Sequence, residues 1–157
     1  KGMNPQRPPL DQVAAEIALL SRELSFTGTL LYEGLEKPMN ALKAGRAPRA
    51  LGLADQVKEA ESLRGSAAEI LGELRLKSAD FAQYGRDFSA PDFPELLHMA
   101  ERECAFWQAF CERSQILLKK LALIADLEKL SPLGRAPIQD AWDEVRALAA
   151  AAEAKSE

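Results

Sequence analysis

The chain has 157 residues, a formal net charge of −4 and 47% hydrophobic residues. This length suits one domain with its own core, and the mild negative charge argues against a nucleic-acid binder, which usually carries a basic stripe. The sequence lacks the run of about 20 apolar residues that a membrane-spanning helix needs. Alanine, leucine, glutamate and arginine dominate, so we expect an all-α fold.

The first helix is predicted from about Pro9 to Lys43, after a flexible lead-in over residues 1–8. Its apolar residues recur at steps of three and four, which is typical of helices packed lengthwise. Proline removes a helix hydrogen bond, so Pro38 is expected to bend or break this helix. Gly45 is expected to end it.

The second helix is predicted from Pro48 or Leu53 to Tyr84, with small residues along its apolar stripe. The third is predicted from an N-cap at Asp92 to about Leu130. Its apolar positions are Leu97, Ala100, Cys104, Trp107, Cys111, Leu118, Leu121 and Ala125, with Leu96, Phe110, Leu117 and Ile124 beside them. A stripe this wide suits the interior of a bundle better than a two-stranded coiled coil.

The aromatic cluster Phe106, Trp107 and Phe110 is the densest in the chain. Core packing is the default interpretation of such a cluster. A helix with aromatic residues on several faces can also present one of them to a partner protein.

The C-terminal segment, residues 132–157, is predicted to be an amphipathic helix on a hinge, after a linker over residues 131–137. Its apolar positions are Ile138, Ala141, Trp142, Val145 and Leu148. Such a helix can dock on the other three, or it can leave the bundle and lie in the groove of a partner. Both alternatives require the same apolar stripe. The tetrapeptide Gly-Arg-Ala-Pro occurs at residues 45–48 and 134–137, and both copies are interpreted as helix boundaries.

Candidate metal ligands are few. Glu95 and His98 match one element of di-iron helical bundles, but that site needs the element twice and His98 is the only histidine. Cys104 and Cys111 are about 10 Å apart along one helix, too far for a disulfide, and each is expected to act as a small buried hydrophobe. This favours a reducing compartment. We expect no metal, no cofactor and no enzymatic activity.

Three segments resemble the FlgN-type flagellar export chaperones: residues 30–33 (Leu-Leu-Tyr-Glu), residues 39–45 (Met-Asn-Ala-Leu-Lys-Ala-Gly) and residues 53–60 (Leu-Ala-Asp-Gln-Val-Lys-Glu-Ala). Residues 112–122 are similar, more loosely, to the late helix of that family. The resemblance extends over about residues 15–130. The chain departs from the family pattern at Arg46, Pro48, Ser114 and Gln115.

The resemblance implies a cytoplasmic, non-catalytic chaperone of type III secretion that binds hook–filament junction proteins before export. It also implies that the client binds the C-terminal amphipathic segment, here Ile138, Ala141, Trp142, Val145 and Leu148. The expected architecture is an elongated up-and-down bundle of three long helices and a shorter fourth, in one domain over residues 1–157. An extracytoplasmic four-helix sensor domain, a metal- or haem-binding bundle that uses His98, and a homodimer remain alternatives.

Overall fold

The computed structural model describes residues 10–87 and 93–156. It contains α1 (Leu10–Lys43), α2 (Leu53–Asp87), α3 (Phe93–Ile124) and α4 (Pro132–Ser156). One 3-10 turn, Arg49–Leu51, precedes α2. Within the described ranges every regular element is helical, which confirms the predicted all-α class. The lead-in over residues 1–8 and the N-cap at Asp92 lie outside the described residues.

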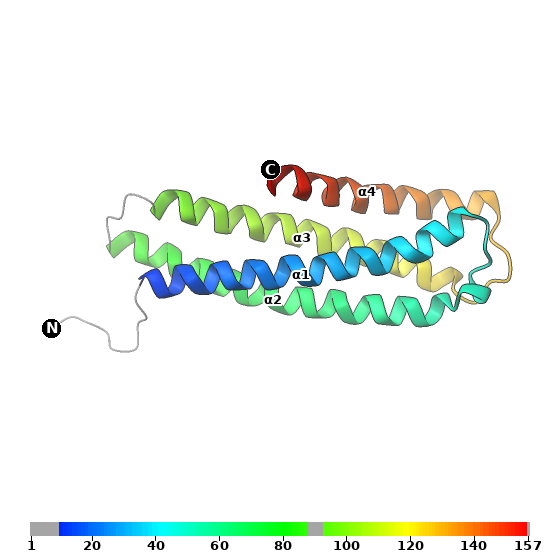
Figure 1. Ribbon diagram of the computed structural model, residues 1–157, viewed down its shortest axis with the longest axis horizontal. Coiled ribbons are helices and arrows are strands. Elements are labelled where there is room, and N and C mark those ends of the chain that lie inside the picture. Colours follow the sequence, from blue (N-terminus) through cyan, green and yellow to red (C-terminus); the bar gives the residue numbers. More distant parts are fainter. Residues whose placement is uncertain (1–9, 88–92, 157) are drawn as a thin grey trace.

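The four helices run up and down along one long axis (Figure 1). α1 packs mainly on α2, α2 on α3 and α3 on α4, whereas α1 touches α3 and α4 much less. The fourth helix is also the shortest, with 25 residues against 32 to 35 in the others. It stops short of the end of the bundle at which α3 begins (Figure 1). The bundle is therefore open along the line between α1 and α4.

The core follows the predicted apolar positions. Leu20, Leu24, Leu31, Leu53, Val57, Leu71, Leu74, Leu118 and Leu121 are all buried in one cluster to which all four helices contribute. Each large apolar side chain buried in this way stabilises the fold by about 1.5–3 kcal/mol. A second, smaller cluster of Val13 and Phe81 lies where α1 starts and α2 ends.

The end of α1 is set by Gly45, as predicted. Gly45 has a φ of 91°, which favours glycine because it has no Cβ. Its N–H donates to the carbonyl of Leu42, and the N–H of Arg46 donates to the carbonyl of Ala41. This is a Schellman motif, which satisfies the last free carbonyls of a helix. Of the bend or break predicted at Pro38, the break does not occur, because α1 continues through this buried residue to Lys43.

The boundary between α3 and α4 differs from the prediction. α3 ends at Ile124 and not near Leu130, because Leu130 is buried in the core and the chain must turn to bring it there. The predicted linker over residues 131–137 is also wrong, since α4 already begins at Pro132. The hydroxyl of Ser131 accepts a hydrogen bond from the N–H of Gly134 and caps the helix.

The second Gly-Arg-Ala-Pro copy, residues 134–137, is consequently helical, while the first forms the turn after α1. The same four residues adopt two structures because only the second copy follows a serine cap and a proline at the first helical position.

Candidate functional site

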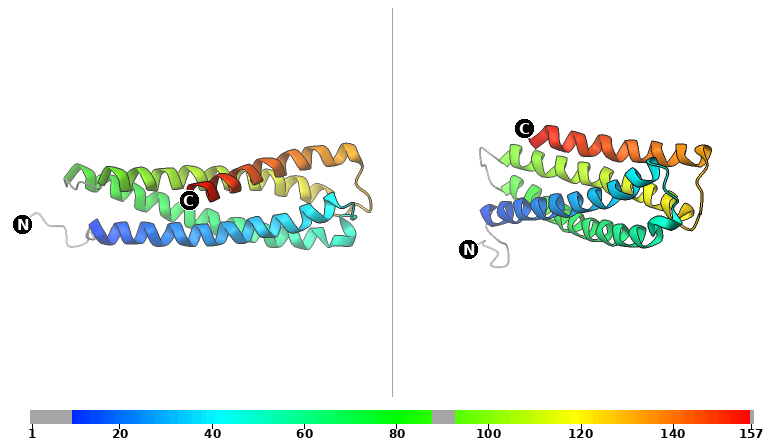
Figure 2. Two further views of the ribbon diagram at one scale, coloured as in Figure 1. Left: turned by 45° about the horizontal axis from the view of Figure 1, so that its top comes forward. Right: turned by 45° about the vertical axis from the view of Figure 1, so that its right-hand side comes forward.

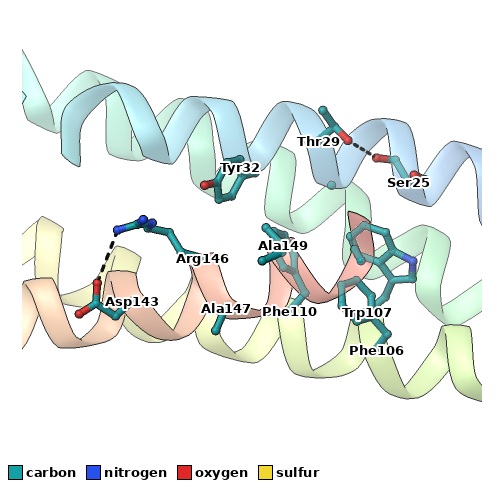
Figure 3. Close-up of a pocket in the computed structure, with 13 residues that line it drawn as sticks. Ser25, Thr29, Tyr32, Phe106, Trp107, Phe110, Asp143, Arg146, Ala147 and Ala149 are labelled. Carbon is teal, nitrogen blue, oxygen red and sulfur yellow. Dashed lines mark hydrogen bonds and ion pairs between the residues drawn. The ribbon is translucent and has the colours of Figure 1, made fainter. Parts of the chain in front are cut away.

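The main concave feature is a groove between α1 and α4, with α3 as its floor (Figure 3). It encloses about 670 Å³. Ser25, Gly28, Thr29 and Tyr32 line it from α1, Phe106, Trp107 and Phe110 from α3, and Asp143, Arg146, Ala147, Ala149, Ala150 and Ala152 from α4. The groove exists because α1 and α4, although they are neighbours in the bundle, pack much less closely than the consecutive helices do.

The floor of the groove is the aromatic cluster noted in the sequence. The Trp107 ring lies edge-on to Phe106 and to Phe110, with ring centroids 4.9 and 5.4 Å apart. Trp107 is only 7% exposed, whereas Phe106 is half-buried. The floor is therefore closely packed and largely apolar, and part of it is open to a ligand.

Gly28 lets the floor approach α1. A Cβ atom at this position would overlap Cζ3 and Cη2 of Trp107, so the indole lies directly on the α1 backbone. The sequence offered one signal for this contact, a glycine on the same helix as a run of buried leucines. The partner on α3 could not be identified without the fold.

An aromatic stack links α1 to α4, and one of its two rings, Tyr32, lines the groove. The rings of Tyr32 and Trp142 are 5.3 Å apart and inclined by 21°. This stack joins the middle of α1 to the first half of α4. From Trp142 toward the C-terminus, α4 lines the groove with Asp143, Arg146 and then alanines only. The large side chain that contacts α1 in this stack is therefore in the first half of α4.

The polar groups of the groove lie on its rim. The Thr29 hydroxyl donates to the backbone carbonyl of Ser25 at 2.9 Å, within α1. On α4, Arg146 and Asp143 form an ion pair at 3.9 Å (Figure 3). These groups can fix the orientation of a bound segment at its edges, while its apolar side chains contact the floor.

The structure places the five predicted partner-binding residues inside the bundle. Ile138, Ala141, Trp142 and Val145 are buried in the core, and Leu148 is half-buried against it. Of the two arrangements that the stripe allowed, this conformation is the docked one. Partner binding by these five residues stays a prediction, and it requires α4 to leave the core.

The other candidate residues lie apart. His98 is exposed on α3, in the second turn of the helix. Cys104 is half-buried with its sulfur 3.8 Å from the Ser78 hydroxyl, and burial raises the pKa of the buried Cys111 thiol. No three His, Cys, Asp or Glu residues of the described ranges come together as a metal site. In the same ranges, none of the helices is apolar over a length that could cross a membrane.

A second hollow of about 420 Å³ lies between the first halves of α1 and α3, past the end of α4. Ile17, Phe81, Leu96, Met99 and Ala100 give it an apolar lining, with Arg102 and Glu103 also part of it. The sequence analysis did not predict this hollow. The residue at which α4 begins and the length of α4 decide which part of α3 is covered, and periodicity gives neither reliably.

Comparison with known proteins adds no relative: the chain matches no protein-family model, no curated protein and no solved structure.

Proposed function

We propose that the protein is a non-catalytic chaperone that holds an amphipathic helix of a client protein in the groove between α1 and α4. The clients that we propose are flagellar hook–filament junction proteins, bound in the cytoplasm before export, in line with the resemblance to FlgN-type chaperones. The floor of the groove consists of aromatic residues of α3, and the wall on α4 consists largely of alanines. This combination is the observation that carries the proposal.

The size of the groove suits a helix. An α-helix about 10 Å in diameter occupies about 420 Å³ for each turn of 5.4 Å. The groove, at about 670 Å³, therefore has room for roughly one and a half turns. A client helix with two or three large apolar residues on one face would contact Phe106 and Phe110 more extensively than the alanines of α4 do.

The packing of α4 favours the groove over the five predicted residues as the contact surface. Ile138, Trp142 and Val145 are each 4% exposed or less. Exposing three such side chains costs about 5–9 kcal/mol in total, at about 1.5–3 kcal/mol each. Moving the alanine-rich turns after Leu148 away from the bundle exposes much less apolar surface and costs correspondingly less. A client can consequently enter beside these turns, or displace them, while the first half of α4 stays docked.

The experiment is a calorimetric titration of the full chain with purified hook–filament junction proteins. Ala150→Trp fills the groove, because Ala150 is an exposed residue that lines it. Ala151→Trp is the matched control, since Ala151 is also exposed, is adjacent on α4 and does not line the groove. We expect Ala150→Trp to weaken binding at least tenfold and Ala151→Trp to change it less than twofold.

Two results would contradict the proposal. Equal affinity of both variants and the wild type would place client binding outside the groove. No binding of junction proteins by the wild type would remove this client class. Circular dichroism of each variant is the control for folding, and we expect both spectra to match that of the wild type.

A further inference from the structure

The connection from α1 to α2 and the connection from α3 to α4 lie side by side at the same end of the bundle (Figures 1 and 2). The backbone N–H of Arg49 donates to the carbonyl of Leu127 at 2.9 Å. The Arg49 guanidinium also forms an ion pair with Glu128 at 2.9 Å. These two contacts join the turn after α1 to the loop after α3, so residues distant in the sequence share this end, which we call the loop end.

The loop end is basic in an acidic protein. Residues 43–55 and 119–135 contain seven Lys and Arg against three Asp and Glu, a net charge of +4, whereas the whole chain carries −4. Lys43, Arg46, Lys119 and Lys129 are exposed there. Of the three acidic residues, Glu128 is already paired with Arg49. The loop end therefore attracts anions although the protein as a whole repels them.

The loop end also carries the two most exposed large hydrophobic residues of the described chain. Leu123 is 84% exposed at the end of α3 and Leu133 is 88% exposed at the start of α4, with Leu127 at 42% between them. All three lie near the loop end of α3 and α4 and line neither of the two large hollows. Isolated exposed leucines at helix ends match a bilayer, into which each can insert separately. A partner helix would instead need a groove that holds several apolar side chains together, and the loop end has no such groove among the large hollows.

We propose that the loop end binds an anionic membrane surface. The exposed lysines and arginines contact lipid phosphates, and Leu123 and Leu133 enter the interface between headgroups and acyl chains. Both signals are needed, because a basic patch alone gives weak, salt-sensitive attachment. In this orientation the far end of the bundle points away from the membrane. The groove between α1 and α4 stays accessible, so the inference is independent of the proposed client.

Flotation with vesicles tests the proposal in the full chain. The vesicles contain 30% phosphatidylserine in phosphatidylcholine, or phosphatidylcholine alone, in 0.1 M salt. We expect at least tenfold stronger partition into the anionic vesicles, since each basic residue near the surface contributes about fivefold. Lys119→Glu/Lys129→Glu and Leu123→Ser/Leu133→Ser should each lower this partition about tenfold or more.

Matched controls change the same residue types elsewhere. Leu76 is a 69% exposed leucine on α2, and Arg22 and Arg102 are exposed on α1 and α3. Leu76→Ser and Arg22→Glu/Arg102→Glu should change the partition less than twofold. All these positions are on the surface, so unchanged thermal melting of each variant shows that folding is intact.

The proposal is overturned if wild type binds both vesicle types equally or binds neither, or if the controls lose as much as the loop-end variants. Tighter binding to double-stranded DNA or polyglutamate than to anionic vesicles at the same salt, unaffected by Leu123→Ser/Leu133→Ser, would also overturn it. That result would assign the basic surface to a soluble polyanion.

Discussion

The contact between Gly28 and Trp107 predicts that an alanine at position 28 destabilises the protein. In the native structure a methyl group there would overlap two carbons of the indole and lie 3.2 Å from a third, Cε3. Trp107 cannot simply turn away, because Phe106 and Phe110 pack against its ring from α3. Gly28→Ala must therefore move α1 away from α3 or force the indole out of its position.

The expected magnitude is the difference between two terms. Overpacking costs about 1–3 kcal/mol, and an overlap with two ring carbons belongs in the upper part of this range, at about 2–3 kcal/mol. Replacing a helical glycine by alanine returns up to about 1 kcal/mol. The net change is a loss of about 1–2 kcal/mol in the free energy of unfolding, which lowers the Tm by about 2–8 °C in a chain of this size.

The assay is thermal and urea denaturation followed by circular dichroism, with Gly65→Ala and Gly72→Ala as controls. Both control glycines are helical and an added Cβ meets no atom within 4 Å, so these variants should gain about 0.5–1 kcal/mol. In a Trp107→Leu background, Gly28→Ala should lose its penalty, which is a double-mutant coupling. If Gly28→Ala stabilises the wild type as much as Gly72→Ala does, the indole does not rest on α1 and the reasoning is refuted.

Three further predictions concern buried and paired groups. Ser114→Ala should raise the stability by about 1 kcal/mol in urea denaturation, because the buried Ser114 hydroxyl lacks a hydrogen-bond partner among the described residues; a loss would show that the hydroxyl is satisfied. The hydrogen bond from Lys77, at 2.6 Å, lowers the pKa of Glu16, so this pair stabilises the fold above about pH 4.3 and the contribution disappears as the pH falls through the lowered pKa. Melting curves of Glu16→Gln should therefore fall below wild type at pH 7, and the gap should narrow as the pH is lowered below about 4.3. A gap that stays constant over this acid range would contradict the pairing. A thiol reagent should modify Cys104 faster than Cys111, whose burial raises its pKa, so Cys104→Ser should remove the fast phase and Cys111→Ser should keep it.

Much of the helical core followed from local pattern. The spacing of Leu20, Leu24 and Leu31 identified the buried face of α1, and the same held for Leu53, Val57 and Leu71 on α2. A helix turns once every 3.6 residues whatever its neighbours are, so periodicity reveals which face must be covered. Leu35, Met39 and Leu42 are buried as well, although Pro38 among them suggested an interruption.

The groove could be predicted only in part. Phe106, Trp107 and Phe110 stood out in the sequence as a cluster with two interpretations, core or partner surface, and the structure places them in the core and on the floor of the groove at once. Helix periodicity does not tell which two helices of a bundle fail to meet. That depends on the Tyr32–Trp142 stack and on the alanines that follow it in α4.

By itself, the sequence determined that this chain forms amphipathic helices, which residues they bury, and that Gly45 ends the first of them, because these properties depend on neighbours within a few residues. Only the tertiary structure decided that α4 docks, that a groove opens beside it, and that two sparse basic segments meet. Lys43 and Arg46 are more than 70 residues from Lys119 and Lys120 in the sequence, and a pattern that recurs every few residues carries no information about such a distance. Whether two such segments lie side by side in space is decided by the side chains that pack the helices together.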